Sequence, residues 1–155
     1  DTIDVVILGY FRGKGARVKL GIGALLAGVY DEESDTFKTI CKIGSGLSEE
    51  NWQQLRKLLD KIKVSKKPVR VDSLLEPDVW VEPKYVFTVM ADEITLSPLH
   101  TAGKDKPDKP GYALRFPRIQ GWIRDKKPED STTVKEIERL FKMQKHVEEK
   151  RGEEK

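Results

Sequence analysis

The sequence predicts a mainly β fold, a small closed barrel of five strands with one helix after the third strand and a second helix at the C-terminus. Three observations support this prediction. Most apolar residues lie in short β-branched runs or in period-two alternation. The chain lacks the regular alternation of strands and long helices that indicates a parallel sheet. Only residues 48–62 and 133–147 repeat apolar residues at helical spacing.

The first three strands come from residues 3–43. Residues 3–8 form a continuous β-branched run that is typical of a buried strand. A glycine-rich basic loop follows, from Gly9 to Gly23, and residues 24–30 and 36–43 then form a hairpin around the acidic connection DEESD. Cys41 alternates with polar neighbours, so we expect a half-buried sheet residue rather than a reactive thiol.

A helix is predicted to begin after Ser48, which is a good N-cap residue, with Leu47 and Trp52 at the two positions of a hydrophobic staple. Its apolar residues recur on one face through about residue 62. Trp52 belongs to that face, so we expect it in the core rather than stacked on a ligand.

The later elements are shorter and interrupted by turns. Residues 69–71 and 79–81 read as short extended pieces, 85–91 as a strong strand that 94–96 continue, and 112–119 as the last strand. Thr101 to Gly111 is a flexible loop. Thr133 and Glu136 form a capping box that opens the final helix.

This order, three strands, a helix and two more strands, matches the oligonucleotide/oligosaccharide-binding (OB) fold. We therefore expect one OB-fold domain over residues 1–147 and a charged, frayed tail over residues 148–155.

Composition limits the classes of function. The chain has 155 residues, 37% hydrophobic and 35% charged, with a net charge of +3, so local basic patches rather than total charge would attract phosphates. The single cysteine excludes an internal disulfide and favours a reduced, intracellular compartment. Two distant histidines give no metal-ligand spacing, and no apolar run reaches membrane-spanning length, so we expect no metal site and no membrane partner. The start at Asp1 without Met suggests an excised domain.

The segment 114–133, LRFPRIQGWIRDKKPEDSTT, concentrates basic and aromatic residues just before the final helix. Arginine binds phosphate oxygens through two parallel hydrogen bonds and lysine adds a point charge, so the segment suits a phosphate backbone or a polyphosphate. The simpler alternative is a basic strand with a solvated face.

The loop GYFRGKGARVKLG forms the second basic set, with Arg12, Lys14, Arg17 and Lys19. Its glycines allow a backbone to approach a phosphate closely. It is neither a Walker A loop, since Ser or Thr does not follow Gly13 and Lys14, nor a dinucleotide fingerprint, since no helix follows. The alternatives left open are a loop that grips nucleic acid and a plain basic connection.

These motifs resemble ATP-dependent DNA ligases of the archaeal and eukaryotic type. The start DTIDVVILGYFRGKGAR, the hairpin and CKIGSGLSEE resemble the segment that follows motif V of those enzymes, and RFPR with DK, PE and TT resembles their motif VI. The weaker pieces PDVWVEP and ADEITLSPLHTA fall in the same order. The resemblance extends from Asp1 to about His146.

The resemblance implies the C-terminal OB domain of a ligase that seals nicks in duplex DNA with ATP and Mg²⁺. The adenylated lysine lies in a K-x-D-G motif on a preceding nucleotidyltransferase domain, and this sequence has no such motif. We therefore expect the chain alone to be inactive and to bind no cofactor by itself. The implied partners are nicked DNA, the nucleotidyltransferase domain and, through other domains, a sliding clamp. The compartment would be the archaeal or bacterial cytoplasm or the eukaryotic nucleus.

The resemblance also assigns residues. Arg124 and Lys126 would contact the ATP pyrophosphate, with Arg118 and Asp125 in the same motif; the spacing from Arg124 to Asp125 is one residue short of the family's R-x-D-K. The implied DNA contacts are Arg12, Lys14, Arg17, Lys19, Arg115, Phe116 and Ile119, with Ile119 at the place of a phenylalanine wedge.

Two other readings remain open. One is a nucleic-acid-binding OB module without ligase chemistry, which usually stacks bases on exposed aromatics. The other is the OB domain of an RNA ligase or an mRNA capping enzyme.

Overall fold

The computed structural model describes residues 1–153; residues 154–155, the end of the predicted tail, lie outside the described residues. The strands are β1 (Thr2–Phe11), β2 (Ala24–Asp31), β3 (Thr36–Ile43), β4 (Lys63–Val64), β5 (Val71–Asp72), β6 (Val79–Val81), β7 (Val86–Met90), β8 (Glu93–Ser97), β9 (Gly111–Arg115) and β10 (Arg118–Arg124). The helices are α1 (Glu49–Asp60) and α2 (Val134–Glu153), with short 3-10 helices η1 (Gly15–Leu20) and η2 (Pro128–Asp130).

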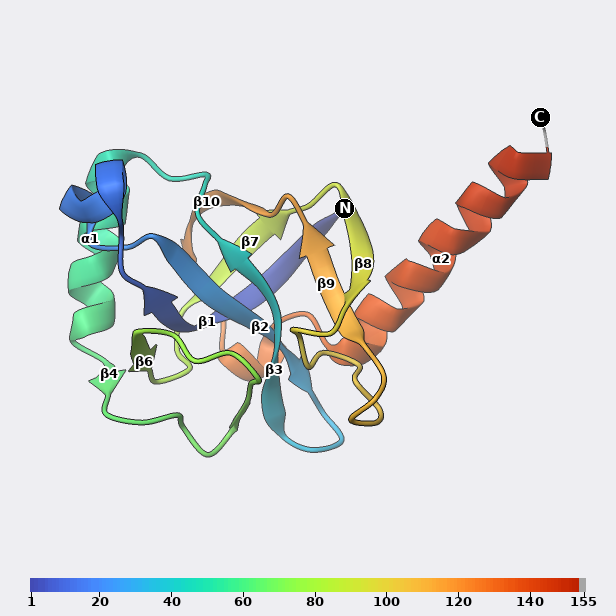
Figure 1. Cartoon of the computed structure of the whole chain (residues 1–155), viewed down its shortest axis with the longest axis horizontal. Helices are drawn as coiled ribbons and strands as arrows, with labels where there is room; N and C mark the ends of the chain where they lie inside the picture. The colour runs from blue at the N-terminus through green and yellow to red at the C-terminus, as the bar shows by residue number, and fades with distance from the viewer. Residues whose placement is uncertain (154–155) are drawn as a thin grey trace.

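A curled sheet forms the body of the molecule (Figure 1). Its strands run in the order β10-β7-β1-β2-β3-β5, β6 pairs with both β1 and β4, and β8 and β9 form a separate two-stranded sheet. The curl brings β10 back to the end of β3, where the N–H of Ile119 donates to the carbonyl of Ser45 at 3.0 Å. The mainly β, OB-type architecture predicted from the sequence is therefore confirmed.

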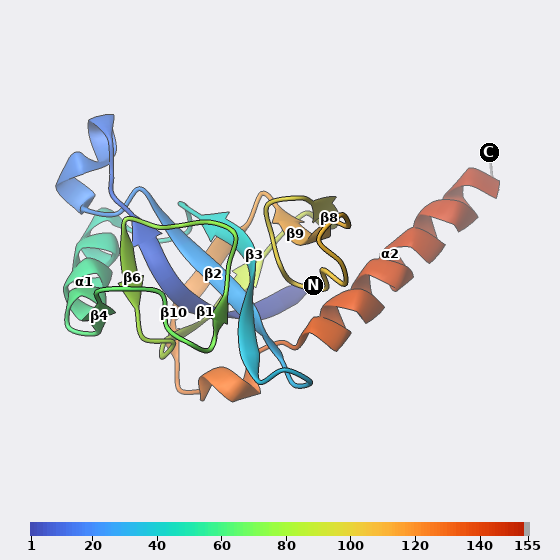
Figure 2. The same ribbon diagram turned by 60° about the horizontal axis from the view of Figure 1, so that its bottom comes forward.

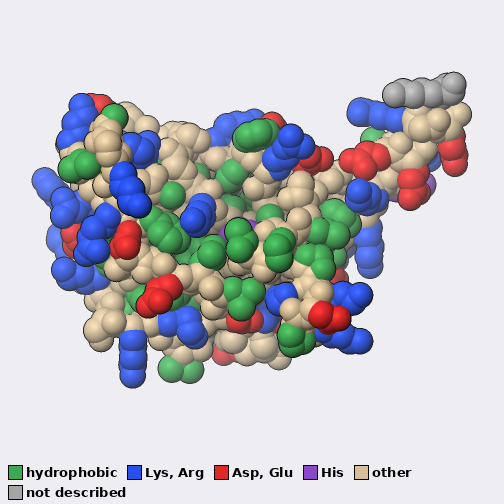
Figure 3. All heavy atoms as spheres, viewed as in Figure 1, with side chains coloured by type: hydrophobic (Ala, Val, Ile, Leu, Met, Phe, Trp, Pro, Cys, Tyr) green, Lys and Arg blue, Asp and Glu red, His purple; other side chains and the backbone are tan. Residues whose placement is uncertain are grey.

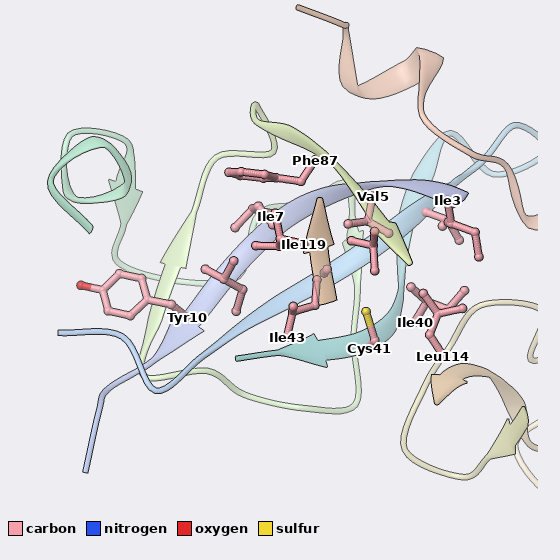
Figure 4. Packing of buried hydrophobic residues seen from close by; sticks show 14 of the residues in the cluster. Ile3, Val5, Ile7, Tyr10, Ile40, Cys41, Ile43, Phe87, Leu114 and Ile119 are labelled. Atoms are coloured by element: carbon pink, nitrogen blue, oxygen red, sulfur yellow. The ribbon is translucent and has the colours of Figure 1, made fainter. Parts of the chain in front are cut away.

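Strand β1 lies at the centre and is covered on both faces. Ile3, Val5 and Ile7 pack into the larger core cluster (Figure 4), whereas Val6 and Leu8 belong to a second cluster on the opposite face. Burial on both faces explains why this strand reads as a continuous apolar run. Removing its apolar side chains from water stabilises the fold by about 25 cal/mol for each Å² buried.

Both predicted helix starts are confirmed by their caps. Ser48 Oγ accepts from the Asn51 N–H at 3.1 Å and opens α1, and Thr133 Oγ1 accepts from the Glu136 N–H at 3.2 Å and opens α2. Trp52 is only 2% exposed and lies in the core, as its helical spacing predicted.

The C-terminal helix extends further than predicted. Residues 148–153, expected to be a frayed tail, continue α2 through Glu153, and Figures 1 and 2 show this end projecting away from the sheet. The Gln144 side chain secures the middle of the helix: its Oε1 accepts from the Ile94 N–H and its Nε2 donates to the Ile94 carbonyl, both at 2.9 Å.

The strand count is a correction, because residues 1–153 form ten strands rather than five. The segment expected to continue β7 turns away after Met90, and β8 pairs with β9 instead. The predicted last strand breaks between Arg115 and Arg118 into β9 and β10, which belong to different sheets. The break follows from Phe116, which has a left-handed φ of 51°, and from Pro117, which has no N–H for a ladder.

Candidate polyphosphate and nucleic-acid interface

Two cations of the 114–133 segment meet on one carboxylate. Lys126 Nζ donates to Asp4 Oδ2 at 2.8 Å, and Arg124 Nη1 lies 3.4 Å from Asp4 Oδ1. Thr88 Oγ1 donates to the same Oδ1 at 2.8 Å and accepts from Arg124 Nη1 at 2.5 Å. The sequence predicted the two cations as site residues, and the structure places them side by side.

The sheet explains this geometry. Asp4 on β1 and Thr88 on β7 are direct cross-strand partners, and β10 lies on the other side of β7. Arg124 ends β10, so the chain leaving that strand carries Lys126 back across the β7–β1 pair. Strands β1, β7 and β10 therefore bring Asp4, Thr88 and Arg124 together, and the residues after β10 bring Lys126 to the same carboxylate.

The surroundings of Asp4 favour its ionised form. Its partial burial would by itself raise its pKa, but the hydrogen bonds from Lys126 and Thr88 and the charges of Lys126 and Arg124 together lower the pKa below the ordinary carboxyl value. The side chain of Asp4 is 16% exposed, so a single partly buried negative charge faces two cations and the three side chains together are net positive.

Both cations keep donors for a ligand. Arg124 uses Nη1 for Asp4 and Thr88, and Lys126 uses one of the three Nζ protons. Among the described residues no hydrogen bond engages Nε or Nη2 of Arg124, and both side chains remain partly exposed. The free donors can bind the oxygens of a phosphate group bidentately.

The RFPR residues form the bend between β9 and β10. Arg115 Nη1 pairs with Glu93 at 2.6 Å, and Arg118 Nη1 donates to Asp92 and to the carbonyl of Phe116, both at 3.0 Å. The Arg115 guanidinium also lies 5.2 Å from the centre of the Phe116 ring. These contacts hold a left-handed backbone that costs about 1–3 kcal/mol in a residue with a bulky side chain.

Phe116 points outward and Ile119 points inward. Phe116 is 64% exposed, a large apolar ring between two arginines. Ile119 is 4% exposed and packs in the core beside Ile7 and Ile43 (Figure 4). Burial of Ile119 disfavours the expectation that this side chain acts as a wedge against DNA, and the exposed Phe116 ring is the better placed of the two for such a contact.

Asp125 separates the two cations in sequence but joins neither. Its side chain is exposed and takes part in no ion pair within residues 1–153. The structure thus gives Asp125 no contact with Arg124 or Lys126, although all three belong to the predicted motif.

The basic loop predicted over residues 9–23 contains the end of β1 and the 3-10 helix η1, so the actual connection begins after Phe11, and it exposes only some of its cations. Arg12 and Lys14 are exposed, and Lys19 pairs with Glu49 on α1 at 3.1 Å. Arg17 lies 5.1 Å from the Trp52 ring centre and donates from Nε to the carbonyl of Ile22 at 3.3 Å. Its guanidinium thus packs against α1, and contact of Arg17 with DNA phosphates stays a prediction.

Sequence reasoning missed the acidic partners of this surface, above all Asp4. A signal for Asp4 was present, since it is the only charged residue in the strand Thr2–Phe11. The loop and the Asp4 cluster are held by different elements, and no ion pair joins them within the described part of the chain. In residues 1–153 no group of three or more His, Cys, Asp or Glu side chains is placed to hold a metal ion, and no helix is long and apolar enough to cross a membrane.

Comparison with known proteins places this surface in a family. Residues 19–126 match the family model described as the ATP dependent DNA ligase C terminal region. The chain is 64% identical over 146 residues to a probable DNA ligase of Dictyoglomus thermophilum, covering 94% of this chain and 25% of that protein. It is 51% identical over 144 residues to a DNA ligase of Sulfurisphaera tokodaii, covering 92% of this chain and 24% of that protein.

Solved structures agree with these matches. The ligase domain of M. tuberculosis LigD aligns with a TM-score of 0.60 and 26% identity over 85% of this chain and 38% of that one. A mycobacterial DNA ligase D complexed with ATP and MES aligns with a TM-score of 0.58 at the same identity, covering 85% of this chain and 37% of that one. The chain spans about a quarter of the length of the curated relatives it matches. The chain belongs to the family of ATP-dependent DNA ligases, of which it represents the C-terminal region.

Proposed function

We propose that this domain closes the active site of an ATP-dependent DNA ligase during lysine adenylation and binds nicked duplex DNA during sealing. The observation that carries the proposal is the arrangement of Arg124 and Lys126 on Asp4, because it presents two adjacent cations with unused donors. A triphosphate offers oxygens at a spacing that two such cations can share.

In the adenylation step, Arg124 and Lys126 would bind the β- and γ-phosphates of ATP. They would stabilise the negative charge that develops on the departing pyrophosphate, which is the usual electrostatic contribution of fixed cations to phosphoryl chemistry. Asp4 would orient both side chains without neutralising them, since one carboxylate faces two positive charges. The reacting lysine and the groups that hold Mg²⁺ would come from the nucleotidyltransferase domain of the same protein.

In the sealing step, the bend between β9 and β10 would meet the duplex near the nick. The exposed Phe116 ring supplies an apolar surface that can stack on a base or sugar, while Arg115 and Arg118 flank it. Arg12 and Lys14 on the basic loop would contact backbone phosphates. Trp52 and Trp80 are buried, which disfavours a module that binds single strands by stacking bases on sheet aromatics.

This role gives the full protein two partners, nicked duplex DNA and the nucleotidyltransferase domain. A sliding clamp reached through other domains is a further partner that we infer from the family resemblance alone. ATP and Mg²⁺ would be cofactors of the whole enzyme, which would act in the cytoplasm or the nucleus according to its source.

Transfer of a radiolabelled adenylate tests the proposal. We expect no label on this chain when it is incubated alone with ATP, and a faster labelling of the matching nucleotidyltransferase domain when the chain is added. A covalent adenylate on this chain, or no stimulation at saturating chain concentrations, would contradict the proposed role.

A further inference from the structure

Positive charge is concentrated in a part of the chain that the motifs do not include. Residues 53–70 contain seven Lys and Arg residues and a single acid, a net charge of +6, whereas the whole chain carries +3. The rest of the chain is therefore net negative. A local excess of this size produces a positive potential over one region of the surface.

The structure places these cations on one edge of the molecule. They extend from the end of α1 through β4 into the following loop, and Figure 3 shows Lys and Arg side chains gathered at the left edge, where Figure 1 places α1 and β4. We call the exposed lysines of this edge the lysine surface. It consists of Lys57, Lys61, Lys63, Lys66 and Lys67.

These lysines are not neutralised by the protein. None of the five takes part in an ion pair within residues 1–153, and Lys67 donates only to the carbonyl of Val71, at 2.6 Å. The one acid of the segment, Asp60, is engaged by the Tyr10 hydroxyl at 2.6 Å and by Arg56 at 3.5 Å. Glu76 and Glu82 are the acids that lie beside this edge on neighbouring segments.

The lysine surface is continuous with the basic loop. Lys63, Arg56 and Arg12 line one polar depression of about 350 Å³. Asp78 in that depression binds the backbone N–H of Arg12 at 2.7 Å, and no ion pair engages the Arg12 guanidinium among the described residues. Three acids, Asp60, Glu76 and Asp78, line the same depression, and hydrogen bonds within the domain engage Asp60 and Asp78. A ligand on Arg12 can therefore extend toward Lys63, past Glu76 as the acid without a hydrogen-bond partner among the described residues.

We propose that the lysine surface binds the sugar-phosphate backbone of duplex DNA at a distance from the nick. The five lysines are flexible point charges, and they contact phosphates without reading base sequence. Their spread over a helix end, a strand and a loop fits an extended, regularly charged polymer. The inference rests on the proposed function, because it extends the contact of Arg12 and Lys14 along the same duplex.

The test compares two triple variants of this chain that remove equal charge. Lys57→Gln/Lys61→Gln/Lys63→Gln alters the lysine surface, and Lys106→Gln/Lys142→Gln/Lys150→Gln alters exposed lysines elsewhere. Binding to a fluorescent nicked duplex that extends well beyond the nick is measured by anisotropy at several salt concentrations. All substituted side chains are exposed, and circular dichroism verifies that both variants are folded.

We expect the first variant to lose about tenfold or more in affinity, and the slope of log K against log salt to fall by about 0.9 for each phosphate contact removed. The control variant should stay close to the unaltered chain. Equal affinities and equal salt slopes for the two variants would overturn the inference. An acidic protein would then be the better candidate partner of the lysine surface. Binding by the unaltered chain tests the proposed function and the difference between the two variants tests the lysine surface, so the two failures are distinguishable.

Discussion

Lys126 donates a hydrogen bond to Asp4 at 2.8 Å although 122 positions separate the two residues. The contact joins the end of the basic motif to the central strand of the sheet. It makes the position of the motif depend on the first residues of the domain.

The Asp4 contacts should make stability depend on pH. The folded-state pKa of Asp4 is lowered, so the stabilisation is complete above the ordinary value of 3.8 and is lost as the pH falls through the folded-state pKa. We expect Asp4→Asn to cost about 1 kcal/mol at neutral pH, since the partners are partly solvated. Urea unfolding across the acid range measures this difference, which should shrink toward low pH. Asp108→Asn in the exposed loop is the control, and a pH-independent difference would contradict the ion-pair explanation.

Phe116 and Ile119 should respond oppositely to truncation. Ile119→Ala should destabilise the chain by about 2–4 kcal/mol, because it leaves a cavity in the core. Phe116→Ala should change stability by less than about 1 kcal/mol, because the ring is already solvated, but it should weaken binding to nicked DNA. Chemical unfolding and anisotropy with a nicked duplex separate the two effects. A large loss of stability in Phe116→Ala would contradict the outward placement of the ring.

The left-handed backbone at Phe116 gives a second expectation. Glycine adopts a φ of 51° without a steric penalty, so Phe116→Gly should be more stable than Phe116→Ala by about 1 kcal/mol. The comparison uses thermal unfolding of the two variants. If glycine is the less stable, as it is in ordinary strands, the bend does not exist in solution.

Substitutions of Lys14 and Arg17 should have different effects on DNA binding and on stability. Lys14→Gln should remove about one phosphate contact, so the slope of log K against log salt for DNA binding should fall by about 0.9. The free energy of unfolding should not change. Arg17→Ala should mainly reduce stability, because its guanidinium packs over Trp52 and bonds to Ile22. Unfolding and binding are measured on both variants, and the reverse pattern would show that Arg17 faces the ligand.

The sequence predicted those features that depend on local spacing. Ser48 and Thr133 cap the two helices because each cap is decided by residues three positions apart. The apolar stripe of α1 likewise identified Trp52 as a core residue. The mainly β class followed from the β-branched runs, which needed no long-range information.

Long-range pairing could not be predicted in the same way. Pro117 was a local signal against an unbroken strand over residues 112–119. The contacts of Arg115 with Glu93 and of Arg118 with Asp92, which orient the bend, were not visible in the sequence. The link between Asp4 and Lys126 appears only once β10, β7 and β1 are aligned. Nothing in the sequence indicated that the Arg17 guanidinium packs on Trp52 of α1, because the two residues are 35 positions apart.

The adenylation and sealing activities of Lys126→Ala in the full-length ligase test the central claim most directly. Lys127→Ala is the matched control, an adjacent exposed lysine that forms no ion pair within residues 1–153. We expect Lys126→Ala to slow transfer of AMP from ATP to the enzyme by about 10²-fold, as the loss of one fixed charge-stabilising donor does in other enzymes. Sealing of a pre-adenylated nick should be much less affected, and Lys127→Ala should be near normal in both steps. Equal loss of both steps in Lys126→Ala, or equal effects of the two substitutions, would contradict a role for the Asp4 cluster in binding the ATP phosphates.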